Sequence, residues 1–407
     1  MALDHHLSVE RDQACQSFIQ ANSNPKHMVG ELSELLKPVA KCKVCGDEPC
    51  DAHRVSTDYM VAGFPCTPYS IQSSSRFKPD YDPMTHPEFS ALPLICKYIR
   101  YVEPGPQVIV LENVEGVLKS IKGKPAPIHF IENGVLEVDG EIFTMGIRHL
   151  TDKYEVLPHF TVKGHTFGLP FSRCRVLWVL LRREGNPNVQ QQKANIIHNM
   201  GLIASNPLKV YRLEILLANQ LAHFDACDDG AWGPPTNKGK RRRTHHGTLP
   251  MTVRSILRSD EWRKAKGLPK VCDEGGRPYS TTPQGKVLRD TYKLTDLELD
   301  TLDCAFLFFG MHVFQQSAID VSQSPCRNPW STQRMPSVTR NSKIFFQEQI
   351  LTPRDMLCLM GWKPGSFSIP QDVGPARIKC MLGNMLCPPV IGAMFLAIMA
   401  RDVPAAG

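Results

Sequence analysis

The chain has 407 residues, 42% of them hydrophobic and 21% charged, with a formal net charge of +7 and an isoelectric point near 8.7. These values are ordinary for a globular protein of two or three domains, and mild basicity fits a nucleic-acid partner. With 14 cysteines, no secretory signal, and a longest apolar run (residues 390–400) too short for a bilayer, the sequence argues against a secreted or membrane-spanning protein. We expect reduced thiols in an intracellular compartment.

The first elements place acidic residues where nucleotide-binding folds use them. A short strand over residues 7–9 leads to Glu10, and a helix is predicted over residues 14–21. A strand that ends in an acid and is followed by a helix is how such folds hold a ribose. Glu31 stands near the start of a second short helix, within residues 26–36. The alternative for both acids is an ordinary surface carboxylate.

A cysteine-rich loop follows. Its pattern is C-x2-C-x4-C-x2-H, formed by Cys42, Cys45, Cys50 and His53. Thiolate and imidazole ligands at short spacing suit a tetrahedral zinc ion. A plain loop insertion is the alternative, because the CxxC half occurs often by accident.

The stretch over residues 59–70 places a cysteine in a stiff loop. Residues 59–62 predict a buried strand, and Gly63, Pro65 and Pro68 end it. Pro65 restricts Phe64 to extended geometry, so Cys66 should lie just past the end of the strand, where open α/β sheets carry reactive groups. For a lone cysteine, a buried structural thiol would be the favoured interpretation.

A second strand end changes that interpretation. Residues 89–102 have helical periodicity, and residues 108–111 read as a strand buried on both faces, followed directly by Glu112 and Asn113. A buried carboxylate needs a partner or a function. Cys66 and Glu112 would stand at one edge of one sheet. Such a pair has a specific use: the thiolate attacks a carbon atom of a substrate ring while the acid protonates that ring.

Later segments are less regular. Arg173 and Arg175 enter an apolar strand on one face, where they either grip a nucleotide phosphate or form a salt bridge.

Two loops have more than one interpretation. Residues 73–87 are either a candidate lid or a solvated loop. The basic run over residues 238–246 either contacts phosphates, acts as a nuclear address or is a solvated loop. Thr352 predicts a helix N-cap. The closing helix over residues 390–401 is apolar nearly all round, so we expect it to be buried.

In these motifs the chain resembles the cytosine-C5 DNA methyltransferases over rather more than half of its length. The matching motifs, in family order, are Pro65-Cys66 with Ser70, Glu112-Asn113-Val114, Gly168 and Pro170 with Arg173 and Arg175, and Gly383-Asn384 with Pro388-Pro389. The resemblance implies an α/β fold: a Rossmann-like S-adenosylmethionine-dependent methyltransferase sheet with a smaller, irregular target-recognition domain. We expect a catalytic domain over residues 1–184, the target-recognition domain over 185–345, and a segment over 346–407 that returns to the catalytic domain.

The resemblance also implies the site. Its catalytic residues would be Cys66, Glu112, Arg173 and Arg175, and the residues that bind S-adenosylmethionine would be Glu10, Glu31 and Asn384. The substrate would be double-stranded DNA with a flipped cytosine, and the location nuclear in a eukaryote. The family's opening Phe-x-Gly-x-Gly strand has no counterpart, and Phe171 replaces a glutamine. A tRNA cytosine-C5 methyltransferase and an inert DNA-binding remnant therefore stay as alternatives. Target context, maintenance or de novo preference and oligomeric state are open.

Overall fold

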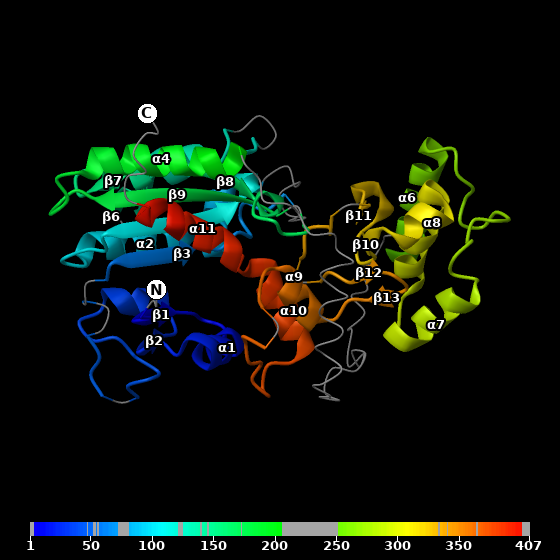
Figure 1. Cartoon of the computed structure of the whole chain (residues 1–407), viewed down its shortest axis with the longest axis horizontal. Coiled ribbons are helices and arrows are strands. Elements are labelled where there is room, and N and C mark those ends of the chain that lie inside the picture. Colours follow the sequence, from blue (N-terminus) through cyan, green and yellow to red (C-terminus); the bar gives the residue numbers. More distant parts are fainter. Residues whose placement is uncertain are drawn as a thin grey trace.

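The computed structural model describes residues 4–400, apart from 47, 52–53, 55–56, 72–80, 121–124, 139–140, 145, 172, 206–250, 333, 340 and 364. Figure 1 shows an α/β lobe that carries both ends of the described chain and, on the right, a second lobe of helices and short strands. The predicted lid lies mainly, and the basic run entirely, outside the described residues.

The main sheet of the first lobe has the strand order β3-β4-β9-β7, with β8 also paired to β9. Its strands are β3 (Tyr59–Gly63), β4 (Val108–Val114), β7 (Tyr154–Val156), β8 (Phe160–Lys163) and β9 (Cys174–Arg182). The β3–β4 pair is parallel, while β9 runs antiparallel to β4, β7 and β8. Strand β4 continues through Val114, so Glu112 lies within the strand and not after it.

Helices cover both faces of this sheet because the apolar residues of β4 alternate between two cores. Val108 and Val110 pack in one core with α4 (Val189–Ser205) and α11 (Pro388–Met399), whereas Ile109 and Leu111 pack in the other with α2 (Ala91–Tyr101). Helix α4 falls within the stretch assigned to the target-recognition domain, yet Asn199 Nδ2 donates to the carbonyl of Ala397 in α11 at 3.1 Å. Helix α3 (Ile128–Asn133) and the hairpin of β5 (Val135–Val138) and β6 (Glu141–Thr144) complete this lobe.

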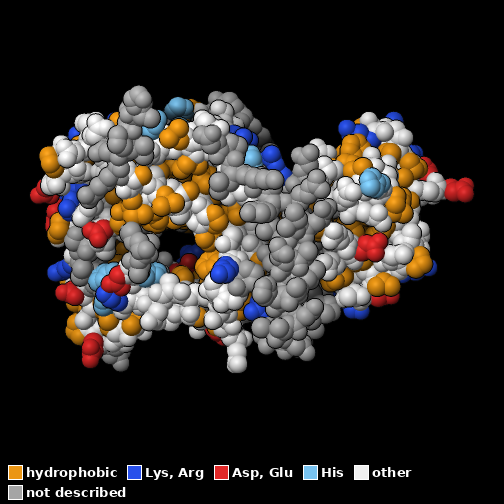
Figure 2. All heavy atoms as spheres, in the orientation of Figure 1, with side chains coloured by type: hydrophobic (Ala, Val, Ile, Leu, Met, Phe, Trp, Pro, Cys, Tyr) orange, Lys and Arg blue, Asp and Glu red, His pale blue; other side chains and the backbone are white. Residues whose placement is uncertain are grey.

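The N-terminal strands form a sheet of their own. Strands β1 (Leu7–Val9) and β2 (His27–Val29) pair in parallel, and α1 (Gln13–Ser23) joins them. Among the described strands, β1 pairs only with β2, and β3 only with β4. The strand predicted at residues 59–62 is confirmed as β3, but the prediction that it is buried is wrong: β3 lies at a sheet edge, and its residues are half-buried or exposed. A cavity of about 1880 Å³ lies between the two sheets, and Figure 2 shows an opening in this region.

The second lobe packs helices on a small antiparallel sheet of order β11-β10-β12-β13. Its elements are α6 (Met251–Ala265), α7 (Pro283–Tyr292), α8 (Asp296–Gln315), β10 (Ala318–Asp320), β11 (Trp330–Ser331), β12 (Ile344–Phe346) and β13 (Gln349–Ile350). Its core is rich in aromatic residues, with Tyr279 and Phe314 at a ring separation of 4.8 Å.

The chain returns to the first lobe through α9 (Pro353–Leu359), α10 (Pro375–Asn384) and α11. Thr352 and Asp355 form the predicted capping box of α9. By length and composition alone, residues Pro375–Met399 are apolar enough to cross a membrane, but they form two helices separated by a break before α11. The predicted burial of α11 holds on one face, with Val390, Met394, Ala397 and Ile398 buried, and is wrong on the other, where Leu396 is 66% exposed and Gly392 is also exposed.

Candidate active site

Cys66 lies in the loop that follows β3, as the prolines predicted. Its carbonyl accepts hydrogen bonds from the backbone N–H groups of Tyr69 (2.9 Å) and Ser70 (2.8 Å), which close a turn behind the thiol. On the other side, Asn113 donates through Nδ2 to the carbonyl of Phe64 at 3.1 Å. Asn113 is fully buried. The loop is therefore fixed both by its own turn and by the neighbouring strand.

Glu112 stands beside the start of that loop. It pairs in register with Gly63, the last residue of β3. A Cβ atom at position 63 would lie 3.1 Å from Oε2 of Glu112, so the absence of a side chain there leaves room for the carboxylate. The Oε1 atom of Glu112 forms an ion pair with Nε of Arg175 at 2.5 Å. Glycine at position 63 and Arg175 thus determine where the acid points.

Burial dominates the titration of both reactive groups. It raises the pKa of Glu112 above its ordinary value, and Arg175 and then Arg173 oppose the increase. Burial likewise raises the pKa of the Cys66 thiol; Arg175 lowers it and Glu112 raises it further. Both groups are therefore biased toward their protonated forms: Glu112 is suited to donate a proton, and Cys66 requires a base or a substrate to become a thiolate.

Arg173 makes different contacts from Arg175. Its guanidinium donates to the carbonyls of Leu382 (3.0 Å), Gly383 (3.0 Å) and Met385 (2.7 Å), at the end of α10. Desolvation lowers its pKa to about 10, and the Arg175 charge adds to the effect. Arg173 is not among the described residues that line the cavity. It is a positioning residue that holds the Gly383-Asn384 segment, and the role of gripping a phosphate stays a prediction.

One cavity brings together the remaining predicted site residues. Cys66, Glu112 and Arg175 lie at one part of its lining, and Glu10, Glu31 and Asn384 also line it. Glu10 follows β1, its backbone N–H donates to Val29 at 3.0 Å, and its Oε1 accepts from the Asp12 N–H at 2.8 Å. Glu31 precedes a short 3-10 helix over residues Leu32–Leu36 without capping it. The cavity could hold a nucleoside-sized molecule with acids and an amide at its wall.

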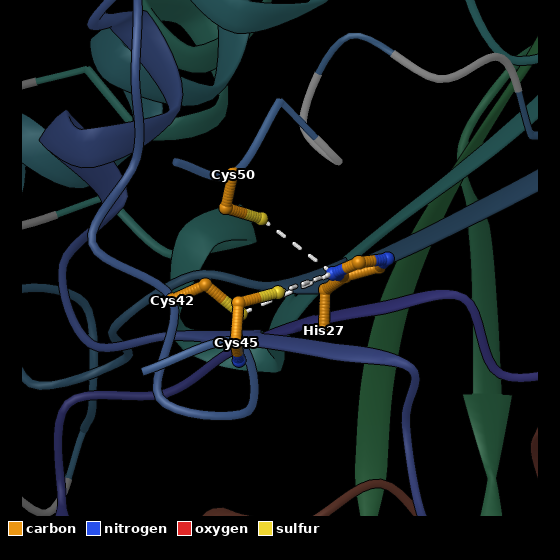
Figure 3. A group of neighbouring side chains, drawn as sticks. All are labelled: His27, Cys42, Cys45 and Cys50. Carbon is orange, nitrogen blue, oxygen red and sulfur yellow. Dashed lines mark hydrogen bonds between the residues drawn. The ribbon is translucent and has the colours of Figure 1, made fainter. Parts of the chain in front are cut away.

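The cysteine cluster has a different fourth member from the predicted one. Cys42, Cys45 and Cys50 gather around His27 of β2 (Figure 3). His53 lies outside the described residues. The short C-x2-C-x4-C spacing revealed the three cysteines, but His27 precedes them by 15 residues and only the fold brings it near.

Two further residues of the site carried weak signals. Asn113 followed the predicted acid directly, yet its task of holding the Phe64 carbonyl depends on how β3 and β4 pair. Gly63 read only as a strand terminator, whereas its position opposite Glu112 makes it part of the acid's environment. Phe171 stands at the place of the family's glutamine. Its side chain is buried in the core, and its backbone forms an isolated parallel β-bridge with Met335.

Comparison with known proteins adds the following. The family model described as C-5 cytosine-specific DNA methylase matches residues 2–400. No curated protein matches the chain. Similar solved structures include the Entamoeba histolytica methyltransferase EhMeth, with 11% identity over 96% of this chain and 88% of that chain and a TM-score of 0.45. A protein described as a prophage-encoded DNA modification methyltransferase from E. coli has 12% identity, 97% and 91% coverage and a TM-score of 0.45. The S. pombe Dnmt2 methyltransferase has 13% identity, 96% and 89% coverage and a TM-score of 0.42.

Proposed function

The chain belongs to the C-5 cytosine-specific DNA methylase family, and from this premise we propose that it is a DNA (cytosine-5)-methyltransferase. The predicted fold class, α/β with a Rossmann-like methyltransferase sheet, is confirmed by the family match and by the sheet with its parallel β3–β4 pair. The observation that carries the proposal is the shared cavity, which is lined by Cys66 and Glu112 and also by Glu10, Glu31 and Asn384.

The chemistry assigned to the side chains follows from their surroundings. The Cys66 sulfur forms a bond to C6 of a cytosine ring while Glu112 donates a proton to N3, so the ring's electron pair becomes available at C5. The raised pKa of Glu112 favours this donation, and Arg175 then stabilises the carboxylate that remains. Once C5 carries the methyl group, its remaining proton leaves to water, the electron pair of that C–H bond forms the C5=C6 double bond, and the C6–S bond breaks to release the Cys66 thiolate. N3 then returns its proton to Glu112. Because a stacked cytosine is out of reach, the base must leave the helix first.

S-adenosylmethionine is the methyl donor that the family implies, and when bound it supplies an electrophilic methyl group for C5. The residues of the cavity fit such a ligand: Glu10 and Glu31 offer carboxylate oxygens for ribose and adenine groups, and Asn384 offers an amide. Arg173 fixes the backbone next to Asn384 through its carbonyl contacts. The chain's own contribution here is binding and orientation.

The choice of DNA over tRNA rests on the sequence Thr67-Pro68-Tyr69-Ser70 after the nucleophile and on the long segment between β9 and β10. Methyl transfer from radiolabelled S-adenosylmethionine to duplex DNA and to tRNA, with Cys66→Ser as the control, tests this choice. Transfer to DNA that disappears in Cys66→Ser supports the proposal. Transfer to tRNA but not to DNA would show that the substrate is tRNA. Full activity in Cys66→Ser would contradict the proposed role of Cys66 as the nucleophile.

An inert DNA-binding protein is the second candidate, favoured by one observation: the cavity separates β1 from β3, so the sheet is split where the proposed ligand would bind. Calorimetric titration of the 407-residue chain with S-adenosylmethionine separates the two candidates. We expect binding that Glu10→Ala weakens. A folded protein that binds duplex DNA but releases no heat with S-adenosylmethionine would favour the inert candidate.

A further inference from the structure

We propose that His27, Cys42, Cys45 and Cys50 form a structural zinc site that fastens the cysteine-rich loop to strand β2. Figure 3 shows the three sulfur atoms of the cysteine-rich loop pointing at the ring of His27, which belongs to strand β2. The four candidate ligand atoms all lie within 4.8 Å of one another. Cys42 and Cys50 are buried, and the other two are half-buried.

The three nitrogen–sulfur separations are close to those of a tetrahedral zinc site. The Sγ atoms of Cys45, Cys50 and Cys42 lie 3.3, 3.5 and 3.9 Å from Nδ1 of His27. Bond lengths of about 2.3 Å to sulfur and about 2.0 Å to nitrogen, at tetrahedral angles, place sulfur and nitrogen ligands about 3.5 Å apart. The four atoms are thus gathered at separations close to those that a bound zinc ion requires.

The backbone around the cluster supports metal binding rather than casual packing. Between Cys42 and Gly46 the chain forms a tight turn in which the Cys45 N–H points at Cys42 Sγ (3.5 Å) and the Gly46 N–H at the Cys42 carbonyl (3.1 Å). Gly46 has φ of 68°, which glycine adopts without strain. An N–H donor at a thiolate is the outer contact that orients metal-bound cysteines.

Four protein ligands leave no open position, so the site is structural and not catalytic. It lies in the part of the first lobe that has the least hydrophobic core: Val29, Leu35 and Ala40 contact Tyr98 and Val102 of the α2 region, and the cysteines form their own small cluster. A metal ion replaces core in such small units. Through His27 the ion would hold β2, and through β2 it would support β1, which precedes Glu10.

Metal analysis of the full-length protein tests the site directly. After purification with zinc and dialysis against a weak chelator, we expect about one zinc per chain in the wild type and about none in His27→Ala or Cys45→Ser. Two matched controls, His53→Ala and Cys272→Ser, should keep the zinc; Cys272 is an exposed free cysteine outside the cluster. Cobalt-substituted wild-type protein should show thiolate-to-cobalt charge transfer and the visible bands of tetrahedral cobalt.

A second measurement applies if a variant fails to fold. When a strong chelator removes the metal from the wild-type protein, we expect a protease to cleave within residues 37–50 at least about ten-fold faster. The rate of cleavage in the second lobe should stay unchanged. If the wild-type protein resists the protease equally well before and after treatment with the chelator, the proposal is overturned. It is also overturned if His53→Ala loses the zinc while His27→Ala keeps it. A disulfide among the three cysteines in freshly purified, non-reduced protein would also overturn it.

Discussion

Nε of Arg175 lies 2.5 Å from Oε1 of Glu112, and both side chains are nearly buried at the edge of the sheet that carries Cys66. The guanidinium compensates the carboxylate without removing the effect of burial, because the pKa of Glu112 stays above its ordinary value. The pair therefore keeps a protonatable acid close to the Cys66 thiol. Because the two groups are close, the charge of Glu112 changes the pKa of that thiol.

Replacement of Glu112 by glutamine should lower the pKa of Cys66. The negative charge of Glu112 raises the thiol pKa and Arg175 lowers it, so Glu112→Gln removes the first effect and frees the second. The pH profile of iodoacetamide alkylation at Cys66 measures the change: wild-type alkylation should rise at a pH above the ordinary thiol value of about 8.5, and the variant at lower pH. Glu115→Gln, at an exposed ion pair with Lys119, is the control and should leave the profile unchanged. A variant profile at higher pH would contradict the geometry.

Gly63→Ala should impair methyl transfer more than folding. The new methyl group would meet Oε2 of Glu112 at 3.1 Å, so the carboxylate must shift by a few tenths of an ångström from its present position. A displaced catalytic group costs about 10–100-fold in turnover, while the melting temperature should change little. Gly392→Ala is the matched control, because nothing lies within 4 Å of a Cβ there. Equal turnover in the two variants would show that the room beside Glu112 is unimportant.

Arg173→Met should destabilise the protein by about 2–4 kcal/mol, since three backbone carbonyls lose a buried, charged donor. Urea unfolding measures the loss, and Arg173→Lys should recover only part of it because an ammonium group cannot reproduce the planar arrangement of donors. Arg377→Gln is the comparison, because its ion pair with Asp12 is largely exposed and we expect little change. A wild-type unfolding midpoint in Arg173→Met would refute the positioning role.

The second lobe contains a buried ion pair between Arg263 and Asp300. Arg263 is fully buried, and its guanidinium bonds to Asp300 (2.6 Å) and to the carbonyls of Gly276 and Pro269. Arg263→Met should cost about 3–5 kcal/mol because it leaves Asp300 buried and uncompensated. The double variant Arg263→Met/Asp300→Leu should regain much of this stability. If the double variant unfolds as easily as the single one, the carbonyl bonds and not the charge pair hold the lobe.

Local chemistry allowed several of these elements to be predicted. The apolar run before Glu112 predicted β4, the prolines placed Cys66 in a fixed loop, and Thr352 marked the start of α9. Contacts between distant segments could not be predicted. Arg173 bonds to carbonyls more than 200 residues away, and His27 reaches the cysteines only because β2 pairs with β1 and the loop folds back on it. The exposure of β3 and of Leu396 also depends on the arrangement of neighbours rather than on composition.

The open edges of β1 and β3 have a consequence for how the protein behaves in solution. A strand edge without a partner is a template for another strand, and here two such edges border the same cavity. Two open strand edges of the described chain thus lie at the proposed ligand site. A small molecule that occupies the cavity shields these edges as well as binding to them, so ligand occupancy and resistance to aggregation should rise together.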